Sequence, residues 1–148
     1  MPIRPENRDR YPDDWKAISQ RVRDEAGQKC EWCGAPNGAL IARGKGHDAG
    51  TYMMPRGETF DAKTGKYLGI SRGSEYNVDR ITKVVLTVAH LDHQPENCAR
   101  DNLRALCQRC HNLYDAPMRR RGIADRAKAA CAVGDFFKDA RPPERGKP

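Results

Sequence analysis

Two Cys-x-x-Cys pairs constrain the fold of this chain more strongly than any other feature of its sequence. The first pair is Cys30 and Cys33, and the second is Cys107 and Cys110. Two residues between cysteines let both thiolates turn toward one ion, and four thiolates complete a closed tetrahedral zinc site. With 148 residues, of which 38% are hydrophobic and 32% charged, the chain has a modest core that a bound ion would stabilise. The sequence therefore predicts a small α+β domain stapled by a structural Zn²⁺ ion.

Residues 34–106 separate the two pairs, a longer stretch than zinc modules usually place between ligand pairs. Long loops add little closure entropy, so we expect the glycine-rich segment 37–80 to loop out between the pairs. A redox-active Cys-x-x-Cys and two unrelated pairs are the alternatives, and the redox interpretation lacks a thioredoxin-like βαβ context. Cys98 and Cys131 have no partner at ligand spacing and are interpreted as ordinary thiols.

The first half of the chain predicts one helix and one glycine-rich insertion. Apolar residues that recur at i, i+3, i+7 and i+11 share one helical face, which predicts a helix over 13–26. The insertion shows little periodic pattern. We expect it to consist of loops and one hairpin that turns at Thr64 and Gly65.

The second half predicts a strand, two helices and a tail. The β-branched run ITKVVLTVAH predicts a strand over 81–90. The second cysteine knuckle leads into a helix over about 108–116, which Pro117 is expected to break. A further helix over about 120–132 precedes a Pro-rich tail that its composition predicts to be flexible. The single predicted domain, 1–148, thus divides into the helix with the first knuckle, the insertion, the core, and the basic helix with its tail: 13–36, 37–80, 81–116 and 117–148.

The charge of the chain favours a polyanionic partner. Its formal net charge is +7, and residues 117–148 contribute most of this excess, with nine Lys and Arg against four Asp and Glu. Basic side chains bind the phosphates of DNA or RNA without reading bases, although a solvated charged helix is the alternative. The candidate DNA contacts are Arg100, Arg104, Arg109, Arg119, Arg120, Arg121, Arg126 and Lys128.

The sequence also predicts the compartment. No apolar run reaches the length of a membrane span, and the segment MPIRPENRDRYPDDW lacks the apolar region of a secretory signal. We therefore expect no membrane partner and a cytoplasmic location. In that reducing compartment, six cysteines are more typical of metal ligands and free thiols than of disulfides.

Histidine, asparagine and aspartate side chains gather around the second knuckle. His111 and Asp115 stand four residues apart, so on a helix they share a face and form a two-point clamp for a divalent cation. Such a clamp leaves coordination positions for water and phosphate. His90 ends the predicted strand, where a neutral imidazole can take a proton from water, and Asn102 can hold backbone groups and orient the histidine. A polar helix face and a structural histidine are the alternatives.

Taken in order, His90, Asn102 and the run NLRALCQRCH, which ends at His111, resemble the HNH endonucleases, whose catalytic unit is the ββα-metal (His-Me) finger. The resemblance covers about 84–116 and reaches back to the first knuckle, CEWCG. The chain length, the excess of basic residues and the arrangement of the motifs are similar to those of phage and prophage members. This resemblance implies a location in the cytoplasm of a bacterium or of a phage-infected host. The resemblance further implies that His90 is the general base and Asn102 the middle asparagine. It assigns His111 and Asp115 as ligands of a catalytic Mg²⁺, Mn²⁺ or Ni²⁺ ion.

One position departs from the family pattern. Many members carry Asp or His directly before the base histidine, and this chain has Ala89. Asp92 or water would then complete the coordination of the catalytic ion, or the ion would be held weakly. Asp92 would alternatively fix the tautomer of His90. His93 is a second candidate base, but it lies nine residues before Asn102, and the twelve from His90 fit the family better.

The expected function is metal-dependent hydrolysis of phosphodiester bonds in DNA, by expectation double-stranded, through nicking or double-strand cleavage. A non-catalytic, zinc-stabilised module that binds nucleic acid is the alternative, and Ala89 supports it. A zinc-dependent interaction adaptor without a nucleic-acid role is a further alternative. Both use the same cysteines and need no catalytic histidine.

Overall fold

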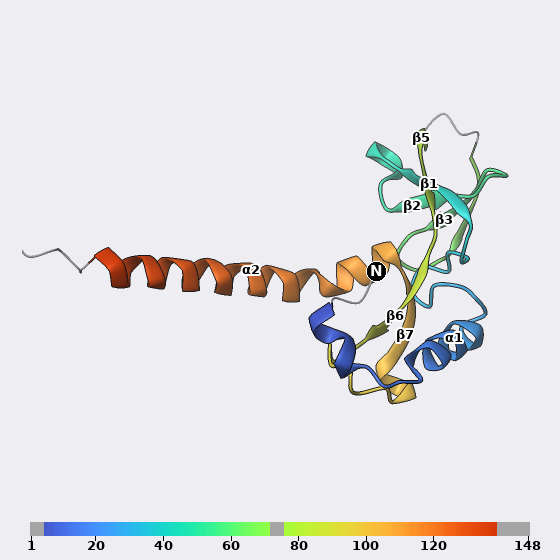
Figure 1. Cartoon of the computed structure of the whole chain (residues 1–148). Helices are drawn as coiled ribbons and strands as arrows, with labels where there is room; N and C mark the ends of the chain where they lie inside the picture. The colour runs from blue at the N-terminus through green and yellow to red at the C-terminus, as the bar shows by residue number, and fades with distance from the viewer. Residues whose placement is uncertain (1–4, 72–75, 139–148) are drawn as a thin grey trace, which may run out of the picture. The chain divides into compact units, whose positions relative to one another are not determined.

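A computed structural model describes residues 5–71 and 76–138 and divides the chain into two units, Met1–Asn112 and Leu113–Pro148 (Figure 1). The first unit is a small α+β fold that contains a short 3₁₀ helix, η1 (Pro5–Arg10), one α-helix and two antiparallel sheets. Among the described residues, no helix combines the length and apolar character that crossing a membrane requires. The expected fold class is therefore confirmed at the level of a small α+β domain.

The helix expected over 13–26 is α1 (Trp15–Glu25), slightly shorter than predicted at both ends. Val22 is fully buried at its centre, and Trp15 and Ile18 pack beside it. These side chains lie on the predicted apolar face, which rests against the hairpin formed by the second half of the unit.

The insertion 37–80 is more ordered than the loops and single hairpin expected from its sequence. It forms a five-stranded antiparallel sheet in the order β4-β3-β2-β1-β5 (Figure 1). The strands are β1 (Leu40–Gly44), β2 (Thr51–Met53), β3 (Glu58–Asp61), β4 (Tyr67–Ile70) and β5 (Tyr76–Lys83). The expected hairpin is confirmed, because β3 and β4 pair across a turn that contains Thr64 and Gly65. Strands of three to five residues are too short to show alternation, so β1 and β2 escaped prediction.

The single strand expected over 81–90 is divided between the two sheets. β5 ends at Lys83 and pairs with β1, whereas β6 (Leu86–His90) pairs with a later strand. The backbone N–H of Val84 donates to the Ala39 carbonyl, and that of Val85 donates to the Gln108 side chain. At the break the chain therefore changes the strand with which it pairs, and the N–H groups of Val84 and Val85 both remain hydrogen-bonded.

The second sheet is the hairpin of β6 with β7 (Leu103–Cys107), entered through the short 3₁₀ helix η3 (Arg100–Asn102). Its register pairs Leu86 with Cys107 and His90 with Leu103. The helix α2 (Gln108–Lys138) begins at the residue after β7. The chain order in this part of the molecule is therefore β6-β7-α2.

The expected break at Pro117 is wrong, because α2 continues through this residue and replaces the two separate helices that were predicted. Proline costs about 3 kcal/mol inside a helix, chiefly through its missing N–H and its steric clash. Pro117 is exposed here, so water can satisfy the carbonyl that lacks an intrahelical donor. The tail predicted to be flexible falls on residues 139–148, which lie outside the described residues.

Candidate functional site

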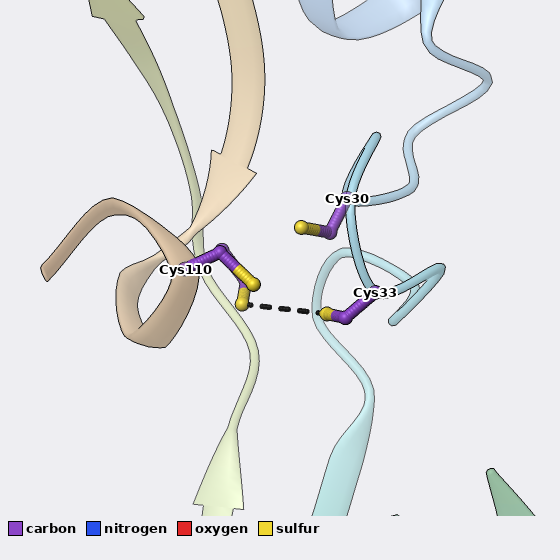
Figure 2. A group of neighbouring side chains, drawn as sticks. Cys30, Cys33 and Cys110 are labelled. Atoms are coloured by element: carbon purple, nitrogen blue, oxygen red, sulfur yellow. Dashed lines mark hydrogen bonds between the residues drawn. The ribbon is translucent and has the colours of Figure 1, made fainter. Parts of the chain in front are cut away.

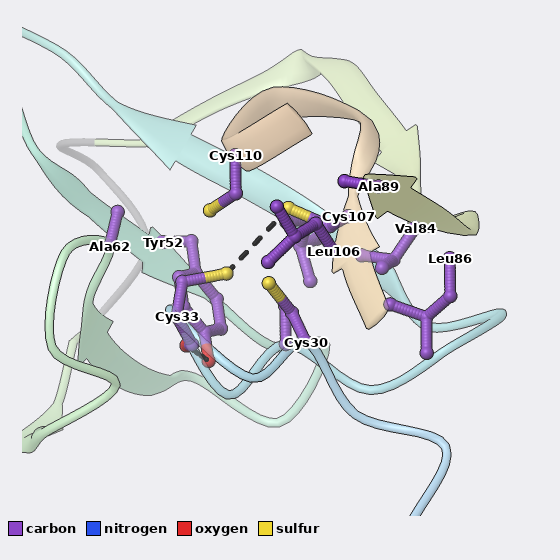
Figure 3. Packing of buried hydrophobic residues seen from close by; sticks show 12 residues of the cluster. Cys30, Cys33, Tyr52, Ala62, Val84, Leu86, Ala89, Leu106, Cys107 and Cys110 are labelled. Atoms are coloured by element: carbon purple, nitrogen blue, oxygen red, sulfur yellow. Dashed lines mark hydrogen bonds between the residues drawn. The ribbon is translucent and has the colours of Figure 1, made fainter. Parts of the chain in front are cut away.

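The four cysteines of the two Cys-x-x-Cys pairs meet at one point of the first unit (Figure 2 and Figure 3). Cys30 and Cys33 lie in the knuckle after α1, Cys107 ends β7, and Cys110 lies in the first turn of α2. All four are buried thiols, and their sulfur atoms lie within 4.8 Å of one another. The sequence-based prediction of a common cysteine cluster is therefore confirmed.

The cluster has the donor chemistry and spacing of a tetrathiolate metal site. A tetrahedral ion with Zn–S bonds of about 2.3 Å separates its sulfur ligands by about 3.8 Å. The sulfur atoms of Cys33 and Cys107 lie 3.7 Å apart (Figure 3). Sulfur hydrogen bonds lower the pKa of Cys107, chiefly through Cys110, and raise the pKa values of Cys33 and Cys110, chiefly through Cys107, so the thiols share their protons as one group. These four residues could hold a metal ion such as zinc.

The first knuckle gets its shape from backbone hydrogen bonds. The N–H of Cys30 donates to the Ala35 carbonyl over 3.0 Å, and the N–H of Gly34 donates back to the Cys30 carbonyl over 2.8 Å. Gly34 has a φ of +70°, a conformation that glycine adopts without strain. The N–H of Glu31 donates to the Ala105 carbonyl and thereby joins the knuckle to β7.

The insertion sheet packs against this knuckle instead of looping away from it. The Tyr52 hydroxyl donates a 3.0 Å hydrogen bond to the Cys33 carbonyl, and Tyr52 and Ala62 lie on the Cys33 side of the cluster (Figure 3). A Cβ at Gly65 would lie 3.1 Å from the Cys33 carbonyl group, so the hairpin tip touches the knuckle closely. The Arg109 guanidinium donates to the Ala62 carbonyl over 3.2 Å. The expectation that 37–80 loops out is thus corrected, because its strands cover the cysteine cluster.

His90 ends β6 and is buried, with 8% of its surface exposed. Its ring stacks on Trp15 at a centroid distance of 4.9 Å and meets the edge of Tyr11 at 5.7 Å. Its Nε2 lies 3.7 Å from the sulfur of Cys98, a thiol that sequence reasoning had treated as ordinary. Burial lowers the pKa of His90, so the imidazole is neutral at physiological pH.

His111 lies in the part of α2 that belongs to the first unit, and its Nδ1 is 2.7 Å from the Thr87 hydroxyl of β6. Thr87 and His90 are three residues apart on a strand, so they project from opposite faces. The Ala89 side chain, on the Thr87 face, packs with the cysteine cluster. His90 therefore points toward α1, whereas His111 is held on the other face of the hairpin.

No protein-family model, curated protein or solved structure matches this chain. What the chain does is therefore inferred from its own residues and their geometry. Within the described ranges, the four cysteines are the one group of three or more His, Cys, Asp or Glu side chains arranged to hold a single metal ion.

Asn102 holds the loop between β6 and β7 closed. Its side chain accepts a hydrogen bond from the Asp92 N–H over 3.0 Å and donates to the Asp92 carboxylate over 2.9 Å. It also donates to the Asn97 carbonyl over 2.8 Å. Hydrogen bonds from the Gln94 N–H and then from Asn102 lower the pKa of Asp92 to about 2. These bonds give Asn102 the predicted task of holding backbone groups and fully engage the Asp92 carboxylate within the loop.

Two further predicted residues lie outside this hydrogen-bond network. His93 has a φ of +58°, and its N–H donates to the His90 carbonyl over 3.1 Å, so it occupies the tight turn after β6. Asp115 follows His111 by four residues in α2 but belongs to the second unit. Its role as a second ligand of a catalytic ion stays a prediction.

The arginines predicted to contact DNA near the site are engaged within the first unit. Arg100 pairs with Glu25 of α1 and donates to the Leu103 carbonyl over 3.0 Å. Arg104 lies 3.8 Å from the Glu31 carboxylate, and Arg109 binds the insertion as described above. Sequence reasoning missed both glutamates, because partners more than seventy residues away along the chain leave no local pattern. The remaining predicted contacts are exposed residues of α2 in the second unit: Arg119, Arg120, Arg121, Arg126 and Lys128.

Proposed function

We propose that this protein is a metal-dependent DNA endonuclease that hydrolyses phosphodiester bonds. Support comes from the order β6-β7-α2, with a four-cysteine cluster at the junction of β7 and α2. The observation that carries the proposal is the bond between Thr87 of β6 and Nδ1 of His111, which secures the predicted metal-binding histidine to the hairpin. A structural zinc ion on the cysteines would hold the two elements that bear these residues in place.

The catalytic ion would be a divalent cation on Nε2 of His111, with water as its further ligands. When bound, such an ion offsets the charge that develops on the phosphate and on the leaving oxygen. A small divalent cation such as Mg²⁺ usually keeps several water ligands, so a site with few protein ligands and Ala89 beside it agrees with its chemistry. The exposed basic residues of α2 would contribute phosphate contacts and salt-dependent affinity.

His90 is the proposed general base. Its neutral imidazole can accept a proton from water, a contribution of about 10²–10⁴-fold in rate. The ring is covered by Trp15 and Tyr11 and points away from the Thr87 face that holds His111. The proposed base can therefore act on water at the ion only after the imidazole turns out of this aromatic cover. The segment that bears Tyr11 is held by a bidentate pair between Arg10 and Glu96, with N–O distances of 2.6 and 3.1 Å.

A nicking assay on supercoiled plasmid with Mg²⁺ or Mn²⁺ tests the proposal. We expect the wild-type protein to convert the plasmid to open circles, and His111→Ala and His90→Ala each to reduce the rate at least a hundredfold. His47→Ala, which changes an exposed histidine, is the matched control and should cleave normally. Undiminished cleavage by His90→Ala together with loss in His93→Ala would transfer the role of base to His93. Absence of cleavage by the wild-type protein, with its zinc bound and its fold intact, would refute the nuclease.

A non-catalytic zinc module that binds nucleic acid is the second candidate. The direction of His90 toward α1, away from the Thr87 face, favours this candidate. It predicts DNA binding that weakens steeply with salt in a protein that never cleaves, because phosphate contacts release counterions. Measuring binding and cleavage on the same DNA over a salt series separates the two functions.

A further inference from the structure

The hydroxyl of Thr87 lies between two hydrogen-bond partners on different elements. Its oxygen is 3.2 Å from the Leu106 carbonyl of β7 and 2.7 Å from Nδ1 of His111 in α2. The strand register pairs Thr87 directly with Leu106, so the first contact is built into the hairpin. The two side chains and the Leu106 carbonyl therefore form a short series of hydrogen bonds across the junction of hairpin and helix.

The number of protons on these groups determines which of them donates and which accepts in the two hydrogen bonds. A backbone carbonyl can only accept, so when Thr87 keeps its hydrogen bond to Leu106, that bond uses its single hydroxyl proton. The Thr87 oxygen can then take part in the second bond only as an acceptor, which requires a proton on Nδ1 of His111. In its neutral form His111 therefore has its proton on Nδ1 and its lone pair on Nε2.

We propose that Thr87 is a positioning residue that locks His111 in the Nδ1–H tautomer and thereby reserves Nε2 for a divalent metal ion. This inference rests on the proposed function for the identity of the ligand, and on hydrogen-bond geometry for the tautomer. A histidine that binds metal through one nitrogen commonly donates its other N–H to an oxygen, which fixes the ring orientation and the tautomer. Thr87 supplies that oxygen here.

Both hydrogen-bond partners of Thr87 are sequence neighbours of cysteines in the cluster. Leu106, which receives the Thr87 proton, directly precedes Cys107, and His111 directly follows Cys110. Leu106 is fully buried beside the cysteines, so its carbonyl is held in place by the same packing. A metal ion on the cysteines would fix the spacing of β7 and α2, and with it the distance that Thr87 spans. The structural site would thus orient the ligand of the catalytic site through one hydroxyl group.

The experiment compares the zinc-loaded protein with Thr87→Val, which removes the hydroxyl at nearly constant volume, and Thr87→Ser, which keeps it. Two-bond ¹H–¹⁵N correlation spectra of the His111 ring, at mildly alkaline pH where histidine is neutral, report which nitrogen is protonated. We expect the Nδ1–H form in the wild-type and Thr87→Ser proteins and a shift toward Nε2–H in Thr87→Val. An Nε2–H ring in the wild-type protein would overturn the lock, even if the valine variant fails to fold.

Binding of Mn²⁺ provides the second measurement, through paramagnetic broadening of the His111 ring signals. We expect Thr87→Val to weaken binding about 10–100-fold, the usual cost of losing an outer hydrogen bond to a metal ligand, and Thr87→Ser to restore it. Equal Mn²⁺ affinity in all three proteins would overturn the role of Thr87 in metal binding. An Nδ1–H ring that binds Mn²⁺ in a protein unable to cleave DNA would refute the endonuclease and leave the lock standing.

Discussion

The Tyr52 hydroxyl donates a 3.0 Å hydrogen bond to the carbonyl oxygen of Cys33, which joins the insertion sheet to the first cysteine knuckle. Tyr52 is fully buried, and burial raises its pKa to about 12, so the phenol stays protonated and keeps its donor. The segment between the cysteine pairs therefore packs against the cysteine cluster.

Replacing this tyrosine tests the link. Tyr52→Phe removes the donor and leaves the Cys33 carbonyl buried without it, so we expect a loss of about 1–3 kcal/mol in the free energy of unfolding. Zinc release to a chelator should also become faster. Tyr67→Phe, at an exposed position of β4, is the matched control for both measurements. Equal chelation rates in the two variants would show that the insertion does not support the metal centre.

Substitution of one cysteine ligand should remove the bound ion and most of the stability. Cys107→Ser takes one of four thiolates from a buried cluster, and the binding free energy of a structural zinc ion is largely folding free energy. We expect loss of zinc in elemental analysis and loss of the cooperative thermal transition. Cys131→Ser, at an exposed cysteine of α2, should keep both. Full zinc content in Cys107→Ser would exclude the tetrathiolate site.

Asn102→Ala should loosen the loop that follows β6. The side chain makes three hydrogen bonds to Asp92 and Asn97, and with about 1 kcal/mol for each we expect a loss of about 2–3 kcal/mol. Amide hydrogen exchange should accelerate at Asp92, whose N–H donates to the Asn102 side chain. Gln94→Ala changes an exposed amide side chain of the same loop and should alter neither quantity. Unchanged exchange at Asp92 would contradict the assigned contact.

His90 should make folding stability depend on pH. Its pKa in the folded protein lies below the ordinary 6.5, so the unfolded chain binds this proton more readily. The free energy of unfolding should therefore fall as pH drops from neutral through 6.5 to the lowered pKa, and this contribution should level off below it. Denaturation curves of wild type and His90→Phe, compared across this window, isolate the effect, because cysteine protonation is common to both. A parallel pH dependence in the two proteins would contradict it.

The aromatic cover of His90 should limit its reactivity. Tyr11→Ala removes the ring whose edge lies over the imidazole, so we expect diethyl pyrocarbonate to modify His90 several times faster. Mass spectrometry of digested protein gives the rate for each histidine separately. Tyr67→Ala, at an exposed tyrosine of the insertion sheet, should leave the rate unchanged. Identical rates in all three proteins would mean that Tyr11 does not shield the ring.

Local features of the sequence were sufficient to predict part of this molecule. The spacing of the cysteines predicted their meeting, the helical repeat predicted α1, and the Thr64-Gly65 turn predicted the β3-β4 hairpin. The helix, the turn and each Cys-x-x-Cys pair depend on residues within a few positions of one another, where covalent geometry and backbone preference restrict the choices. The meeting of the two distant pairs was predicted because a closed zinc site needs four thiolates. Asn102 was expected to hold backbone groups for the same reason, since its loop partners lie within ten residues.

Only the tertiary structure decided which face of the hairpin meets which helix. Alternation places Thr87 and His90 on opposite faces, but packing of α1 and α2 determines that His90 stacks on Trp15 while Thr87 binds His111. The insertion sheet could not be predicted from the sequence either, because its short strands are stabilised by pairing with each other and by contact with the knuckle. Such contacts join residues far apart in the chain. Many of them are made by backbone N–H and C=O groups, which nearly every residue carries, so they leave no local pattern in the sequence.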